Sequence, residues 1–396
     1  MKNDPLEMLR LFQADLIHIR RDIHANPELA FQETRTSQIV AGKLAEWGIE
    51  VHRGIAQTGL VGVVRGKKNT SGRAIGLRAD MDCLPMHETG DVPHKSRNPG
   101  RMHACGHDGH TTMLLGAARY LAQTRNYDGT AHLIFQPAEE GGGGASVMVK
   151  EGLFDRFPCE AVYALHNWPA LPAGKMAVRP GPVLAATDEM RITIRGTGGH
   201  GAMPHLTADP VVAAAQVITA LQTIASRNAN PQDAIVVSVC SMETSQLGTF
   251  NVIPGHVLLV GTVRTFKPEM RDLAERRVRE IAGQVAQALG TSAEIEYRRG
   301  YPATVNAERE AVFAAKVGER VFGAPNVITD AEPTMGGEDF SYMLQARPGA
   351  YVFLGQGGGP SSCFLHNPGY DFNDAVIPLG AGYLAALVEE SLPLSK

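Results

Sequence analysis

The chain has 396 residues, of which 44% are hydrophobic and 20% are charged, proportions that are typical of globular proteins and that exclude a fibrous or disordered chain. Its 37 Lys and Arg against 41 Asp and Glu give a net charge of -4. Because this balance lacks the basic excess needed to neutralise a row of phosphates, we expect no nucleic-acid partner. The length favours two domains over one.

The amino-terminal segment, residues 1–30, carries charges throughout and lacks the uninterrupted apolar core of a secretory signal. It is predicted to form an amphipathic helix. No stretch approaches the roughly 18 consecutive apolar residues of a membrane span, so we expect no membrane association. The 5 cysteines are odd in number and widely spaced, unlike those of a disulfide-rich secreted domain. We therefore expect a cytoplasmic protein with free thiols.

Strand-like and helical segments alternate through the first half of the chain and again near its end. The predicted strands are 60–64, 74–79, 131–136, 161–166 and 350–355, and the main predicted helix is 108–124. This alternation predicts an α/β domain with a mostly parallel sheet covered by helices.

A different order of elements fills residues 184–298. The predicted order there is strand, helix, strand, strand, helix, strand, at residues 188–196, 209–227, 234–242, 256–266, 268–289 and 293–299. That order is typical of a ferredoxin-like α+β sandwich. Its insertion makes the first domain discontinuous, with residues 1–183 and 299–396 on either side of it.

The segment GRMHACGHDGH at 100–110 places Cys105 and His107 two residues apart, just before a predicted helix. A thiol and an imidazole at this spacing can bind one metal ion. A buried cysteine and a helix-capping histidine would give the same local pattern, so this segment alone does not decide between the two interpretations.

The segment FQPAEEGGGGA at 135–145 places Glu139 and Glu140 after a predicted strand. Because adjacent side chains diverge at a strand end, one carboxylate can bind a metal while its neighbour accepts a proton from water. A solvated acidic turn is the ordinary alternative. His166 in ALHNWP and His366 in FLHNP are isolated histidines, which are more often hydrogen-bonded scaffold than ligands.

These separate signals agree on one location. Asp80, Glu139, Glu140 and His166 are each predicted at or after the carboxyl end of a strand, where active sites form in open α/β sheets, and His366 lies in a later loop that follows a strand. The possible donors are too many for one open zinc site and suit two metals that share a ligand. They are Cys105, His107, Glu140, His166 and His366.

Segments spread over residues 15–390 resemble, in order, the hippurate hydrolase-like amidohydrolases, within the dinuclear metallo-aminoacylase and carboxypeptidase family. These segments are RRDIHANPELAFQE, GLRADMDCLPMHE, GRMHACGHDGH, LIFQPAEEGGGGA, LHNWP, GGHGAMPH, NVIPGHVLLVGTVRTF, MGGEDFSYM and LHNPGYDFND. The resemblance implies a two-metal hydrolase with a sheet-based catalytic domain and an inserted lid that also mediates dimerisation.

The resemblance also implies a role for each donor. Cys105 is expected to bridge the two metals, with His107 and His166 completing one site and Glu140 and His366 completing the other. Glu139 is expected to act as the general base.

The sequence departs from the wider group at two places. That group usually has His-x-Asp at the end of the strand that holds Arg78 and Asp80, and an Asp where Cys105 stands. Arg78 cannot bind a cation, so we expect His107 to replace the missing imidazole. The role of Asp80 is left open by this departure, and we expect it to orient a ligand through a hydrogen bond.

The predicted lid supplies three further candidates. His200 in GGHGAMPH resembles the lid histidine that reaches across the dimer to the scissile carbonyl, where it would stabilise the oxyanion. Asn251 and Arg264 resemble the pair that holds the substrate carboxylate, and a guanidinium can bind both carboxylate oxygens. Local alternatives remain, because His200 and Asn251 could be turn residues and Arg264 a surface charge.

We therefore predict a metal-dependent hydrolase of the amide bond of N-acyl amino acids, with peptide-bond hydrolysis of the dipeptidase or carboxypeptidase type as the alternative. The expected cofactors are two divalent ions per subunit, with Zn, Mn, Co and Ni all compatible with the donors. The expected partners are a small N-acyl amino acid and a second copy of the chain, in a homodimer through the lid or a higher homo-oligomer.

Three rival functions are less well supported. A cysteine hydrolase with Cys105 as nucleophile would leave Glu139, Glu140 and His366 without a role. The match of GTGGHG at 196–201 to a dinucleotide-binding loop lacks the acidic residue expected about 20 residues later. A non-catalytic peptide-binding protein would not need every ligand and the base together.

Overall fold

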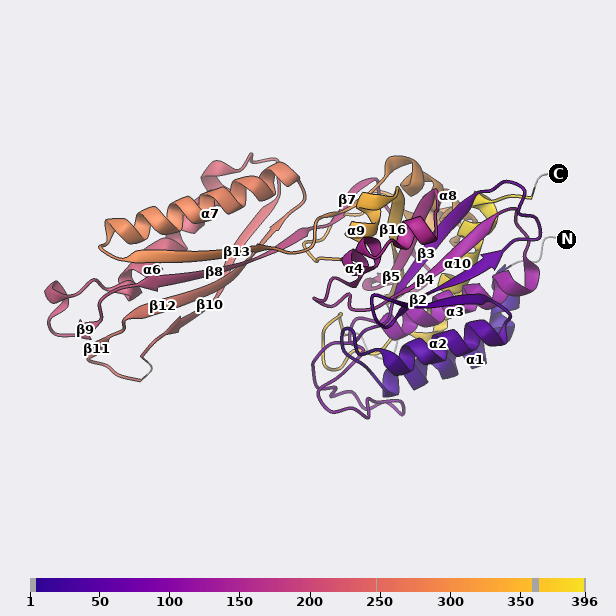
Figure 1. Ribbon diagram of the computed structural model, residues 1–396, viewed down its shortest axis with the longest axis horizontal. Coiled ribbons are helices and arrows are strands. Elements are labelled where there is room, and N and C mark those ends of the chain that lie inside the picture. Colours follow the sequence, from indigo (N-terminus) through magenta and orange to yellow (C-terminus); the bar gives the residue numbers. More distant parts are fainter. Residues whose placement is uncertain (1–4, 247, 358–362, 395–396) are drawn as a thin grey trace. The chain divides into compact units, whose positions relative to one another are not determined.

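A computed structural model describes residues 5–246, 248–357 and 363–394 (Figure 1). Internal contacts divide the chain into two compact units. The first unit comprises Met1–Val183, Val305–Glu332 and Asp339–Lys396, and the second comprises Leu184–Thr304 and Pro333–Glu338. The predicted boundaries at 183/184 and 298/299 remain predictions of where two independent domains divide.

The first unit is built on an eight-stranded sheet in the order β1-β2-β4-β3-β5-β16-β6-β15. The strands are β1 (Glu50–Ile55), β2 (Gly59–Arg65), β3 (Ala74–Asp80), β4 (Thr130–Gln136), β5 (Ala161–Pro172), β6 (Met176–Ala177), β15 (Val327–Ile328) and β16 (Gly349–Gly357). Its centre is parallel, since β3 pairs in parallel with β4 and β5, and β5 with β16. The predicted mostly parallel sheet is confirmed, with antiparallel pairs at β1–β2, β2–β4 and β6–β16.

The central strands are buried on both faces. Every residue of β3 is buried, and β2, β4 and β16 each have one residue that is not. Continuous burial of this kind is typical of parallel strands that lie between two layers of helices. The helices of this unit are α1 (Pro5–Ala25), α2 (Thr34–Glu46), α3 (His107–Thr124), α4 (Gly144–Lys150), α5 (Leu153–Arg156), α8 (Glu308–Phe322), α9 (Ser341–Ala346) and α10 (Ile377–Ser391).

Helix α3 links the sheet to the rest of the first unit. It packs against β3, α1 and α10, and α1 and α2 lie beside it in Figure 1. The first turn of α3 therefore lies near the end of β3, and this places the Cys105–His107 segment beside the sheet. Among the described residues, no helix combines the length and the apolar character that crossing a membrane requires.

The second unit has a four-stranded antiparallel sheet in the order β10-β12-β8-β13. Its elements are β8 (Ala186–Arg195), β9 (Gly199–His200), α6 (Pro210–Leu221), β10 (Ile235–Thr244), β11 (Val252–Ile253), β12 (His256–Thr265), α7 (Pro268–Ala288) and β13 (Ser292–Arg299). Both β8 and β12 alternate buried and less buried residues, because α6 and α7 cover one face only. The order of elements and of strands is that of a ferredoxin-like sandwich.

The dinucleotide-binding alternative does not fit this unit. His200, the fifth residue of GTGGHG, lies in the short strand β9, which pairs with β11. Helix α6 begins only at Pro210. A phosphate-binding loop requires the glycine turn to open directly into a helix, which is absent at this position.

Candidate metal centre

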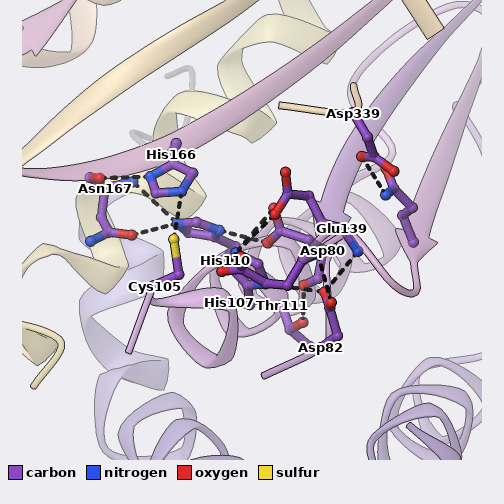
Figure 2. Close-up of polar contacts among 12 residues, drawn as sticks. Asp80, Asp82, Cys105, His107, His110, Thr111, Glu139, His166, Asn167 and Asp339 are labelled. Atoms are coloured by element: carbon purple, nitrogen blue, oxygen red, sulfur yellow. Dashed lines mark hydrogen bonds and ion pairs between the residues drawn. The ribbon is translucent and has the colours of Figure 1, made fainter. Parts of the chain in front are cut away.

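The strand ends bring the candidate residues together in the first unit (Figure 2). Arg78 of β3 is the register partner of Ala164 of β5, and Asp80 and His166 each lie two residues further along their strands. Glu139 follows the end of β4 by three residues. The prediction that His166 ends its strand is wrong, because β5 continues to Pro172 as a partner of β16.

The structure gathers the five predicted metal ligands into two overlapping groups. The ligand atoms of Cys105, His107 and His166 all lie within 4.8 Å of one another, and so do those of Cys105, Glu140 and His366. The Cys105 Sγ lies 3.4 Å from Nε2 of His166, and Nε2 of His366 lies 3.4 Å from Oε1 of Glu140. Cys105 belongs to both groups, which is the arrangement expected of a shared ligand.

Glu139 lies at the edge of this cluster. Its Oε2 is 4.0 Å from Nε2 of His107, and it forms a further group of possible ligands with His107 and Glu140. The residue is 7% exposed. Glu139 therefore has a carboxylate beside the ligand atoms, where it could exchange a proton with a water held there.

Asp82 holds the two glutamates and one histidine in place, and the sequence reasoning missed it. Its carboxylate accepts hydrogen bonds from the backbone N–H of Glu139 at 3.0 Å and of Glu140 at 2.8 Å. Its Oδ1 also lies 3.2 Å from Nδ1 of His107. A carboxylate two residues beyond the strand end at Asp80 was the available signal, since ligating histidines commonly pair with such a group.

Asp80 and His110 form a second supporting network, and His110 was also missed. Nδ1 of His110 lies 2.6 Å from Asp80, and its Nε2 lies 2.6 Å from Oδ1 of Asn167 (Figure 2). Arg78 donates to Asp80 at 2.7 Å, and Asp80 is 3.8 Å from Nε2 of His107. The network joins β3, α3 and β5, and Asp80 makes its hydrogen bonds there with His110 and Arg78. The expectation that Asp80 orients a metal ligand stays a prediction.

Unusual backbone conformations occur at three points of the centre. Gly106, between Cys105 and His107, has φ 98°, and a Cβ there would lie 2.3 Å from Oδ1 of Asn167. Ala138 and His366 have φ 55° and 61°, which is uncommon for residues other than glycine. Such conformations persist only where the surroundings hold them, and they cluster at functional sites.

The polar environment of Ala138 and His366 explains how they are held. Glu33 accepts a hydrogen bond from the N–H of Ala138 at 2.9 Å. The N–H of His366 donates to the carbonyl oxygen of Ala104 at 2.8 Å. Both contacts fix the backbone directly next to a candidate functional side chain.

Burial and neighbouring charges shift the pKa values of the candidate ligands. Burial and the nearby His110 lower the pKa of His166 well below its usual value, which favours the neutral ring that binds metals. Burial and the Glu140 carboxylate raise the pKa of the Cys105 thiol. Hydrogen bonds with Cys105 and Glu140 raise the pKa of His366 to about 10.

For His107 and Asp80, neighbouring charges outweigh the effect of burial on the pKa. Burial lowers the pKa of His107, but Asp80 and Cys105 together raise it well above its usual value. Burial raises the pKa of Asp80, but His107 and Arg78 hold it well below its usual range.

The donor set fits divalent metal ions. It combines a thiol, imidazoles and a carboxylate, which are the ligand types of zinc and neighbouring transition metals. Nε2 of His107 is buried, and no described residue forms a hydrogen bond with it. A buried ring nitrogen without a hydrogen-bond partner is available as a ligand for a cation.

The three candidates from the predicted lid lie in the second unit. His200 of β9 is the register partner of Val252 in β11, and Asn251 accepts a hydrogen bond from Gly201 through its carbonyl, so His200 and Asn251 are neighbours. Arg264 lies near the far end of β12, eight residues beyond His256, or roughly 26 Å along the strand. The second unit therefore does not bring Asn251 and Arg264 together.

The sequence is similar to known hydrolases over nearly its whole length. Residues 76–390 match the model of peptidase family M20/M25/M40. The chain is 41% identical to the hippurate hydrolase of Campylobacter jejuni over 95% of this chain and 96% of that protein. It is 36% identical to the N-acetyl-L-cysteine deacetylase of Bacillus subtilis over 95% of this chain and 88% of that protein.

A solved structure supports the same relationship. The dinuclear metal-binding peptidase of the M20 family from Bacillus subtilis is 32% identical, with a TM-score of 0.82 over 97% of this chain and 99% of that chain. The predicted family resemblance and the predicted enzyme class, a hydrolase of amide bonds that uses divalent metals, are confirmed. The chain belongs to peptidase family M20/M25/M40.

Proposed function

We propose that this protein hydrolyses the amide bond of N-acyl amino acids and releases a carboxylic acid and a free amino acid. The observation that carries the proposal is the pair of ligand groups that share Cys105, with the Glu139 carboxylate beside them. The names of two relatives, hippurate hydrolase and N-acetyl-L-cysteine deacetylase, support this class of substrate.

In this proposal, His107 and His166 would hold one cation, Glu140 and His366 would hold a second, and Cys105 would be available to both. Bound there, two divalent ions would polarise the scissile carbonyl and make a water acidic enough to attack at neutral pH. Asp82 would keep His107 and the backbone of both glutamates in register with the ions, through the hydrogen bonds described above.

Glu139 would act as the general base and then as the general acid. Its carboxylate accepts the proton of the attacking water and later delivers it to the departing amine nitrogen. An amine is a poor leaving group until its nitrogen is protonated, so the same carboxylate serves both steps. The 7% exposure of Glu139 keeps other waters from competing for its oxygens.

His200 would stabilise the oxyanion, and Asn251 and Arg264 would bind the substrate carboxylate. Asn251 lies next to β11 and Arg264 near the far end of β12, and this separation supports a homodimer, in which one copy supplies His200 and Asn251 and the other supplies Arg264. We also propose a cytoplasmic location, in keeping with the free cysteines. The donor set suits Zn, Mn, Co or Ni.

The test is hydrolysis of N-acetyl, N-benzoyl and longer-chain N-acyl amino acids by protein loaded with each metal in turn. Activity should disappear with a strong chelator and return when a divalent ion is added back. Activity that resists the chelator, or faster cleavage of dipeptides than of every N-acyl amino acid, would contradict the proposal.

A further inference from the structure

Three aromatic side chains lie next to the candidate metal centre in the first unit. The ring of Trp168 is 4.5 Å from that of Phe353 and 5.2 Å from that of Phe364, centroid to centroid, and the second pair is edge-to-face. Phe353 is 7% exposed, whereas Phe364 is 47% exposed. We call Trp168, Phe353 and Phe364 the aromatic wall.

A single exposed phenylalanine is ordinary on a protein surface, so the position of this one carries the argument. Trp168 follows His166 by two residues on β5, and side chains two apart on a strand point to the same face, roughly 7 Å apart. Phe353 is the register partner of His166 on β16. Two members of the wall therefore lie beside one proposed metal ligand.

Phe364 lies close in the chain to His366, a proposed ligand of the other metal. It precedes His366 by two residues, and the backbone N–H of His366 is fixed to Ala104 at 2.8 Å. The left-handed backbone of His366, with φ 61°, turns the chain at this point. The wall is thus anchored to the backbone segments that carry ligands of both proposed metals.

The chemistry of an N-acyl amino acid decides which half of it faces this surface. The amino-acid half carries a carboxylate, which requires cationic or hydrogen-bonding partners. The wall offers ring faces and ring edges, with the indole N–H as its polar group. The uncharged acyl half is therefore the part that gains free energy from contact with the wall, and an aromatic acyl group gains most because it can stack edge-to-face.

On the basis of the function proposed above, we propose that Trp168 and Phe364 form the acyl subsite of the enzyme and select substrates whose acyl group carries an aromatic ring. Phe353 supports Trp168 from within the sheet. Neither Trp168 nor Phe364 takes part in the bond-breaking step, so both determine specificity through binding of the acyl ring.

The first test compares N-benzoyl and N-acetyl derivatives of one amino acid in Phe364→Leu and Trp168→Leu. Each variant should lower the ratio of kcat/KM for benzoyl over acetyl by about tenfold. Phe313→Leu is the matched control, because Phe313 lies on α8 beside Tyr163, outside the aromatic wall, and its ratio should equal that of the parent protein. Metal content and Tm are measured for every variant. Because Phe364 is exposed, Phe364→Leu should fold as the parent protein does.

The second test observes Trp168 directly. The chain has 2 tryptophans, so in Trp47→Phe the emission comes from Trp168 alone. Titration of the metal-loaded variant with benzoate should change this emission, and titration with acetate should change it much less. Adding Phe364→Leu should raise the benzoate concentration needed for half of the emission change by about tenfold.

The outcomes separate the subsite from the function. Equal losses for benzoyl and acetyl substrates, together with no benzoate-dependent emission change, would overturn the acyl subsite while leaving the hydrolase proposal intact. Failure of the parent protein to cleave either substrate would overturn the proposed function, and the benzoate titration would then still decide whether the wall binds an aromatic acid.

Discussion

The Sγ of Cys105 lies 3.4 Å from Nε2 of His166, although 61 residues separate the two in the chain. Cys105 is also shared by the two candidate ligand groups. A side chain common to both groups should matter to both cations, so its loss should be felt more strongly than the loss of any other proposed ligand.

Cys105→Ala should therefore bind both metals at least tenfold more weakly than the parent protein. The measurement is elemental analysis of protein dialysed against buffer of graded metal concentration. Cys240→Ala is the matched control, since Cys240 is an exposed free thiol of the second unit and its loss should not change metal content. Full occupancy of both metals in Cys105→Ala would show that the thiol is not a shared ligand.

Glu139→Gln should retain metal and lose turnover. The amide is nearly the same size as the carboxylate but cannot accept and return the proton, so kcat should fall by about 10²–10⁴-fold. Elemental analysis and steady-state rates on one preparation check both parts. Glu140→Gln should behave differently and lose metal, and near-normal turnover in Glu139→Gln would remove Glu139 from the role of base.

Asp82→Asn should weaken metal binding without removing any ligand. The Asp82 carboxylate interacts with the backbone N–H of Glu139, the backbone N–H of Glu140 and the ring of His107. An amide has only one accepting oxygen, so at least one of these three interactions is lost. We expect metal affinity to fall by about 10–100-fold in a competition titration with a chelator.

A matched control for Asp82 exists in the same unit. Asp128 also accepts two backbone N–H groups, from Thr70 at 2.7 Å and Ser71 at 3.1 Å. Asp128→Asn should lower the free energy of unfolding and leave metal affinity unchanged. Equal metal affinities in the two variants would mean that Asp82 supports the fold but does not position the ligands.

Gly106→Ala should destabilise the protein and reduce metal binding. The added Cβ would lie 2.3 Å from Oδ1 of Asn167 and 2.8 Å from the Tyr370 hydroxyl oxygen, and φ 98° is unfavourable for alanine. Gly100→Ala isolates the cost of the positive φ from the cost of the clash. Gly100 has φ 75°, and a Cβ added there would have no neighbouring heavy atom within 4 Å among the described residues.

Urea unfolding should show a loss of about 1–2 kcal/mol for Gly100→Ala, the cost of the left-handed conformation alone. The loss for Gly106→Ala should exceed this by several kcal/mol, since clashes in a packed interior add to it. Equal losses would contradict the close approach of Asn167 and Tyr370 to Gly106.

His132→Phe should make the protein less sensitive to acid. Burial lowers the pKa of His132 from 6.5 to about 4 in the folded state. Between these two values the unfolded chain takes up a proton that the folded protein does not, so folding stability is lost as the pH falls from 6.5 to 4. Above pH 6.5 the ring is neutral in both states and contributes no pH dependence.

The size of the effect follows from the shift. A change from 6.5 to about 4 corresponds to about 3 kcal/mol lost by the parent protein across this range and absent from His132→Phe. Unfolding free energies from urea titrations at pH 7, 5.5 and 4 check it. His103, whose pKa burial lowers to about 4, acts in both proteins and cancels in the comparison, so parallel curves would contradict the prediction.

The sequence by itself determined the class of fold and the family. Continuous apolar runs predicted the parallel strands β3, β4, β5 and β16, because strands covered on both faces need no polar side. The order of strands and helices in residues 184–298 predicted the ferredoxin-like sandwich of the second unit. Such patterns follow the repeat of a strand or a helix, which is set by residues close together in the sequence.

The tertiary structure alone decided how the side chains of the centre meet. The position of Asp82 just beyond a strand end was only a weak signal, because the roles of Asp82 and His110 arise from contacts with Glu139, Glu140 and Asn167 on other elements. Sequence spacing also could not show that His166 lies inside β5, since the continuation of that strand depends on pairing with β16. Distances between residues far apart in the chain follow from the register of the sheet and the packing of α3, and only the folded chain fixes these.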